Sequence, residues 1–155
     1  MTHVYLPMTL SDVSAVLATG DVGPVPSIGY SVTAGLRAEN PDESDEELEY
    51  AAQVRAAGAS VARLIGDPGA PRRRVVLVVD VEEAAVADAD GLETAAVEIV
   101  VSVPIRRVVS ALVDDPAAEP TVARVVADPD DSDALSDLED HQLLWFAAQE
   151  LHELV

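Results

Sequence analysis

Short runs of apolar residues divide the chain and predict a sheet of about five strands. The run at Val75–Val81, VVLVVDV, is almost continuously apolar, which is typical of a strand buried on both faces. Two further runs follow it, at Ala96–Val103 and Val108–Val113. Shorter β-prone segments precede it at His3–Leu6 and Ile28–Thr33. The chain therefore contains enough strand-forming sequence for one central sheet.

Between and after these strands, apolar residues recur at helical spacing. Helices are predicted over Leu10–Gly20, Asp45–Ile65, Thr121–Ala127 and His141–Leu154. Ser44 precedes Glu47 by three residues, which is the spacing of a capping box at the start of the longest helix. Pro7 is expected to end the first strand, because proline cannot donate a ladder hydrogen bond. The segment at Glu82–Leu92 is acidic and its apolar residues are interrupted, so we assign neither a helix nor a strand to it.

The order of these elements predicts the fold class. Strands and helices alternate at first, then strands follow one another, and two helices come last, which indicates an α+β fold. A chain of 155 residues is expected to form a single domain over residues 1–155. We predict a mixed or mostly antiparallel sheet with about three to four helices packed on it.

The large negative charge of the chain limits which partners it is expected to bind. The chain has 29 acidic and nine basic residues, a net charge of −20, and every basic residue is arginine. Such a surface repels phosphate backbones and anionic lipid headgroups, so neither nucleic acid nor a membrane is expected as a partner. It favours an unknown protein or another cationic partner. Solubility alone also explains the charge, and does so more simply.

Several kinds of chemistry are excluded or have no motif. There is no cysteine, so disulfides, thiolate metal sites and cysteine nucleophiles are excluded. His3, His141 and His152 show no metal-ligand spacing, and no phosphate-binding glycine motif occurs, so no cofactor is expected. The N-terminus has no signal-peptide pattern, and no apolar run approaches the roughly 18 residues of a membrane span. A soluble, cytoplasmic protein is expected.

The segment DPDDSDALSDLE has the spacing of an EF-hand calcium loop. The oxygen ligands would come from Asp128, Asp130, Ser132, Ala134 through its carbonyl, Ser136 and Glu139. Asp133 stands where the loop requires a glycine, and acidic spacings arise easily in so acidic a chain. We therefore favour an exposed acidic connector over residues 128–140, placed before the C-terminal helix.

Arg72, Arg73 and Arg74 form a basic cluster that has two interpretations. Three guanidinium groups are a candidate anion-binding site, since they match phosphate and carboxylate oxygens. The alternative, which we favour, is structural: charges before a hydrophobic strand discourage aggregation and pair with acidic neighbours. Arg106 and Arg107 repeat this arrangement before the strand at Val108–Val113.

The predicted C-terminal helix, HQLLWFAAQELHELV, holds the only tryptophan and the only phenylalanine. Its apolar stripe is typical either of a helix that docks on a partner or of one that packs on its own sheet. In a chain with so few aromatic residues, we favour Trp145 and Phe146 as core residues of the domain itself.

Four segments carry a resemblance to a known family. HVYLPMTL, EELEYAA, PRRRVVLVVDV and HQLLWFAAQEL resemble an uncharacterised actinobacterial family of short acidic proteins, a domain of unknown function. The resemblance covers most of the chain. It implies an actinobacterial source and no particular activity.

The order of the early elements is also similar to small families related to the ADP-ribosyltransferase fold. In those families a histidine follows the tyrosine of the first strand, whereas Leu6 follows Tyr5 here. Tyr30, Ser31 and Thr33 stand on the predicted second strand, where such families carry a serine or threonine. No glutamate has a clear catalytic placement, so the resemblance implies that nicotinamide chemistry is lost.

We therefore interpret the chain as a non-catalytic interaction or accessory domain, with no catalytic residue assigned. Its contact surface is predicted to include Tyr5, Thr9, Tyr30, Ser31, Thr33, Glu46 and Glu49. Two alternatives stay open. One is an active or degenerate ADP-ribosyltransferase-like nucleotide-binding enzyme, with a cleft between the first two strands and an arginine near it. The other is a domain stabilised by calcium in the acidic segment.

Overall fold

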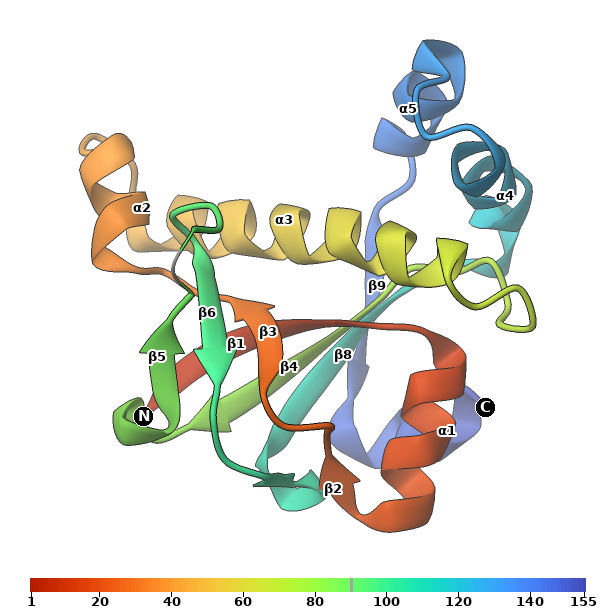
Figure 1. Ribbon diagram of the computed structural model, residues 1–155. Coiled ribbons are helices and arrows are strands. Elements are labelled where there is room, and N and C mark those ends of the chain that lie inside the picture. The colour runs from red at the N-terminus through yellow and green to blue at the C-terminus, as the bar shows by residue number, and fades with distance from the viewer. Residues whose placement is uncertain (90) are drawn as a thin grey trace.

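The computed structural model describes residues 1–89 and 91–155, and its centre is a seven-stranded sheet (Figure 1). The strands run in the order β5-β6-β3-β1-β4-β8-β9, and every recorded pair in this sheet is antiparallel. Their bounds are β1 (Thr2–Met8), β3 (Ser27–Tyr30), β4 (Val75–Val81), β5 (Val86–Asp88), β6 (Ala96–Ile99), β8 (Val108–Asp114) and β9 (Leu143–Ala147). A separate ladder joins β2 (Asp21–Val22) to β7 (Val103–Pro104). The predicted α+β class with a mostly antiparallel sheet is confirmed, but the sheet has more strands than predicted.

The helices lie on both faces of this sheet. They are α1 (Leu10–Thr19), α2 (Ala34–Glu39), α3 (Asp45–Ile65), α4 (Glu119–Ala127) and α5 (Ser132–Glu139). Short 3₁₀-helices occur at η1 (Glu83–Ala85), η2 (Ile105–Arg107), η3 (Pro116–Ala118) and η4 (Ala148–Glu153). Figure 1 shows α3 crossing one face of the sheet, while α1 lies against the opposite face. None of the helices in residues 1–89 and 91–155 has the length and apolar composition to cross a bilayer.

Strand alternation separates the interior into two cores. On β4, Val75, Leu77 and Val79 face the side of α1 and η4, whereas Val76 and Val78 face α3. All five side chains are buried, so the predicted burial of this strand on both faces is confirmed. A third apolar cluster joins the C-terminal half of α3 to α4 and α5.

The longest helix, α3, has the predicted bounds of Asp45–Ile65. The Ser44 side chain accepts from the Glu47 amide, and the Glu47 carboxylate accepts from the Ser44 amide, which completes the predicted capping box. A buried hydroxyl then connects the helix to the sheet. Ser60 Oγ donates to the carbonyl of Met8 at 2.6 Å and accepts from the amide of Val75 at 3.0 Å.

The first strand continues through Pro7, contrary to prediction. β1 pairs with β4 along its whole length, from Thr2 opposite Val81 to Met8 opposite Val75. On its other side β1 pairs with β3 only at Tyr5 opposite Tyr30, so Pro7 has a single neighbouring strand. Proline is tolerated at such a position because the missing amide leaves no second ladder incomplete.

The C-terminal part of the chain requires two corrections. The predicted helix at His141–Leu154 is wrong, because its first half forms strand β9 on β8 and its second half forms η4. The predicted acidic connector at 128–140 contains helix α5, whose N-cap is Asp131. Ala134 and Leu138 lie four residues apart on this helix and are buried in the third cluster, which explains why the acidic segment is ordered.

The observed elements also differ from the predicted ones at three shorter segments. The predicted strand at Ile28–Thr33 ends at Tyr30, since Thr33 caps α2, which no pattern predicted. The run at Ala96–Val103 is divided between β6 and β7. The unassigned segment at Glu82–Leu92 contains η1 and β5, and its residue 90 lies outside the described residues.

Candidate functional site

A polar hollow of about 310 Å³ opens beside the N-terminal half of β1, on the α3 side of the sheet. Its lining residues are Met1, Thr2, His3, Tyr5, Ser31, Val32 and Glu49. Tyr5, Ser31 and Glu49 all belong to the predicted contact surface, and they come from β1, the residues after β3, and α3. The structure therefore brings together residues that are far apart in the sequence.

The sheet holds the Tyr5 ring in place at the base of this hollow. Tyr5 pairs with Tyr30 on one side and Val78 on the other, and the residue is only 3% exposed. Burial raises the pKa of the Tyr5 hydroxyl, while a hydrogen bond with Gln53 lowers it and the nearby charge of Glu49 raises it further. The ordinary pKa of a tyrosine hydroxyl is already about 10. The phenol is therefore neutral at physiological pH and can both donate and accept a hydrogen bond.

Glu49 provides the charge of the hollow. It lies on α3 four residues before Gln53, on the side of the helix that faces Tyr5. The residue is exposed, and no arginine or histidine pairs with it among the residues that the structure describes. His3 also lines the hollow, and its Nε2 lies 3.9 Å from the carboxylate of Asp80. Within residues 1–89 and 91–155, the hollow thus presents a carboxylate without a salt-bridge partner beside a neutral hydroxyl.

The remaining predicted contact residues are mostly engaged in the fold. Thr9 is 1% exposed and caps α1, and Thr33 caps α2. The Ser31 hydroxyl donates to the His3 carbonyl at 2.8 Å, which fixes the backbone at the rim of the hollow. Tyr30 is half-buried, and burial, with the charge of Glu93, raises its pKa. Together with buried Tyr5, it forms no exposed aromatic patch.

Arg72, Arg73 and Arg74 bind atoms of the fold itself. Arg74 donates through Nε and Nη2 to the two carboxylate oxygens of Asp114, each at 2.8 Å. Arg73 donates to the Asp114 carbonyl, and Arg72 donates to the carbonyls of Leu64 and Asp67. The three guanidinium groups therefore have three different sets of partners instead of converging on one anion.

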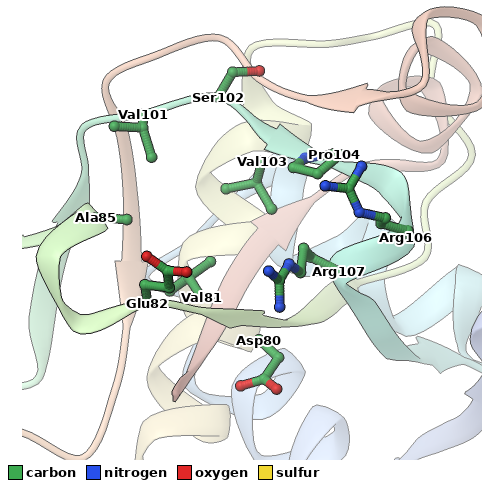
Figure 2. A pocket seen from close by; sticks show the side chains of 10 residues that line it. All are labelled: Asp80, Val81, Glu82, Ala85, Val101, Ser102, Val103, Pro104, Arg106 and Arg107. Carbon is green, nitrogen blue, oxygen red and sulfur yellow. The ribbon is translucent and has the colours of Figure 1, made fainter.

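A second hollow, of about 160 Å³, lies on the α1 side of the sheet (Figure 2). Its lining residues are Asp80, Val81, Glu82, Ala85, Val101, Ser102, Val103, Pro104, Arg106 and Arg107. Figure 2 shows Glu82 and Arg107 on opposite sides, with Val81 and Val103 between them. Two carboxylates and two guanidinium groups balance in charge, so this hollow offers little net attraction to an ion of either sign.

The acidic segment has helical geometry where the calcium pattern requires a loop. Ser132, Ala134, Ser136 and Glu139 all lie within α5, and the Ala134 side chain is buried. The Asp131 carboxylate accepts from the amides of Asp133 and Ala134, which makes it the cap of this helix. Asp128 likewise accepts from the amide of Asp130. Within residues 1–89 and 91–155, no group of three metal-ligating side chains is placed to hold one ion.

We expect calcium, magnesium and sodium chlorides of matched ionic strength to raise the melting temperature by the same amount. All three salts screen the repulsion within a chain of net charge −20, and α5 presents no loop to surround an ion. Differential scanning fluorimetry measures the three shifts. A rise specific to calcium would show that the ion binds the native state preferentially.

The outer edge of β9 is the other open surface. β9 is the last strand of the sheet, and no further strand pairs with it in the part of the chain that the structure describes (Figure 1). Trp145 is 64% exposed and Leu144 is 42% exposed. The expectation that Trp145 packs in the core is therefore wrong. Phe146, by contrast, packs against the core on the α1 side.

These features define a strongly acidic α+β protein with an antiparallel sheet, a polar hollow and an open sheet edge. The chain belongs to a family of unknown function, DUF6912, which matches residues 2–155. No curated protein and no solved structure matches the chain.

Proposed function

We propose that this protein is a non-catalytic interaction or accessory domain that receives a basic side chain of a partner in the hollow beside Glu49. The observation that supports this proposal is the exposed Glu49 carboxylate, which has no cationic partner in the described chain and lies beside Tyr5 and Ser31. The net charge of −20 steers a cationic partner toward the surface.

The chemistry of the hollow suits an arginine or lysine side chain. Glu49 supplies the counter-charge, and the neutral Tyr5 hydroxyl supplies an acceptor for a second N–H group. Glu46 lies one turn earlier on α3 and adds to the negative potential. Glu49 is exposed, so an ion pair formed with it is screened by solvent and contributes modestly.

The alternative of an ADP-ribosyltransferase-like enzyme receives less support. A dinucleotide carries a pyrophosphate, which requires cationic or backbone donors, and the residues that line the hollow include no arginine. Glu49 would repel such an anion. The actinobacterial source and the cytoplasmic location stay predictions.

The test is a titration with N-acetyl-arginine amide, followed in ¹H–¹⁵N spectra of the ¹⁵N-labelled protein. We expect saturable shifts that cluster at His3, Ser31 and Gln53. Glu49→Gln should weaken binding about fivefold, which corresponds to roughly 1 kcal/mol for one partly exposed ion pair. Glu139→Gln makes the same chemical change on an exposed position of α5 and should leave the affinity unchanged.

Two results would contradict the proposal. Shifts spread evenly over all acidic segments would show only unspecific attraction to a polyanionic surface. Equal affinities of the wild type and Glu49→Gln would show that the hollow does not bind the guanidinium group.

A further inference from the structure

We propose that the free edge of β9 binds an extended segment of a partner protein by strand addition, and that this segment has an apolar centre and basic ends. The proposal concerns the opposite edge of the sheet from β5 and does not depend on the Glu49 hollow. It rests on three features of β9: its unprotected edge, its exposed apolar side chains and the charges at its two ends.

The two edges of the sheet differ in protection. Natural edge strands avoid unwanted pairing by being short, charged, bulged or interrupted by proline. β5 has three residues and ends in the exposed carboxylate of Asp88. β9 has five residues, LLWFA, with no charge and no proline, and its register with β8 is continuous from Leu143 to Ala147. The Ala147 amide already donates to the Glu150 carboxylate at 3.2 Å. The backbone groups on the outer side of Leu143–Phe146 are therefore the ones that another strand would pair with.

The exposed side chains extend the contact to both faces of the sheet. Trp145 and Leu144 are consecutive in the strand, so they lie on opposite faces. They are 64% and 42% exposed, which leaves apolar surface beyond what β8 covers. A strand paired with β9 would place its alternate side chains beside these two and remove them from water.

Acidic residues at both ends of β9 favour a partner segment with basic ends. Asp140 precedes the strand, and Glu150 and Glu153 follow it in η4. None of the three has a salt-bridge partner in residues 1–89 and 91–155. In an antiparallel pair of two copies, Asp140 of one chain would approach Glu150 and Glu153 of the other. Like charges therefore oppose a second copy, whereas lysine or arginine at the ends of a partner segment would complement them.

The length of β9 sets the size of the segment. Five residues at about 3.3 Å each span roughly 17 Å, so a segment with basic groups beyond both ends needs about seven to nine residues. Its central residues would be β-branched or otherwise strand-forming, with apolar side chains toward Trp145 and Leu144.

The first probe is a nine-residue peptide with a Val-Val-Thr-Val-Val centre, which places valines on both faces of the strand, and two arginines at each end. Trp145 is the only tryptophan of the chain, so its emission reports directly on the proposed site. We expect a saturable blue shift as the peptide removes the ring from water. The same peptide with glutamates at its ends, and a version with alternate backbone amides N-methylated, should produce no shift.

The second measurement uses fluorescence anisotropy of the labelled peptide with protein variants. Trp145→Thr keeps a strand-forming residue but removes the apolar contact, and it should weaken binding about tenfold or more. Tyr50→Ala removes another exposed aromatic ring, on α3, and should leave binding unchanged. Glu49→Gln should leave the blue shift of Trp145 produced by the peptide unchanged, which separates this site from the Glu49 hollow, where the arginines of the peptide can also bind. Melting curves of each variant establish that it is folded.

Other outcomes would overturn the proposal. Equal binding of the N-methylated peptide would show attraction between charges without strand pairing. Equal binding of Trp145→Thr and the wild type would place the peptide elsewhere. If sedimentation shows a dimer of the free protein that Trp145→Thr abolishes, the occupant of the edge is a second copy of this chain.

Discussion

Replacing Asp114 with alanine is expected to lower the free energy of unfolding by about 3–5 kcal/mol, because it leaves the guanidinium group of Arg74 in a dry site without its counter-charge. The Asp114 side chain is 0% exposed and that of Arg74 is 11% exposed. The same carboxylate also accepts from the Arg74 amide at 2.8 Å. Arg74 in turn donates to the carbonyl of His141, just before β9. The pair therefore joins β4, β8 and the start of the last strand.

Urea unfolding followed by circular dichroism measures this loss. Arg37→Met is the matched control, since Arg37 pairs with Asp45 on the surface and should contribute at most about 1 kcal/mol. The double variant Arg74→Met with Asp114→Leu should be more stable than Asp114→Ala alone, because it removes both charges together. Equal small losses for Asp114→Ala and Arg37→Met would show that the buried pair is not needed for stability.

Gly29→Ala is expected to destabilise the protein by about 1–3 kcal/mol, through overpacking of a tightly filled core. A Cβ atom at this position would lie 2.5 Å from Val4 Cγ1, 2.9 Å from Leu6 Cδ2 and 3.3 Å from the Tyr5 carbonyl oxygen. These contacts are too short, and the neighbours belong to the central strand. β3 therefore carries a glycine because β1 leaves no room for a side chain.

Gly58→Ala makes the same substitution, but we expect it to raise the free energy of unfolding, whereas Gly29→Ala lowers it. Gly58 lies inside α3, it is exposed, and a Cβ atom there has no neighbour within 4 Å. Alanine should therefore stabilise the protein by roughly 0.5–1 kcal/mol, because it restricts the unfolded chain and favours helix. Chemical denaturation of both variants gives the comparison. Equal changes in both would contradict the steric explanation for Gly29.

Two elements could be predicted from sequence patterns that involve only neighbouring residues. The bounds of Val75–Val81 and Asp45–Ile65 agree with prediction, because a continuous apolar run specifies a buried strand and a capping box specifies where a helix begins. Helix α5 was missed, although Asp131 caps it and two apolar residues recur at helical spacing. Because the segment is so rich in acidic residues, it was interpreted as a connector and not as a helix.

The candidate site could be named in part but not assembled from the sequence. Tyr5, Ser31 and Glu49 were among the predicted contact residues, yet only the pairing of β1 with β3 and the crossing of α3 place them around one hollow. Thr9 was in the same set and is buried as a helix cap. A hydroxyl near the start of a helix looks the same in the sequence whether it caps the helix or faces a ligand.

By itself, the sequence determined the acidic surface, the α+β class, the central strand and the long helix, since each depends on composition or on neighbours within a few residues. Only the tertiary structure decided whether the segment HQLLWFAAQEL forms a helix or a strand. Its apolar spacing suits either a helix or a strand, and the unpaired edge of β8 supplies the hydrogen bonds that make it β9. The same kind of long-range contact decided that β1 continues through Pro7 and that Trp145 lies at an open edge. Backbone hydrogen bonds between strands join residues far apart in the chain, and no local pattern records which partner will be present.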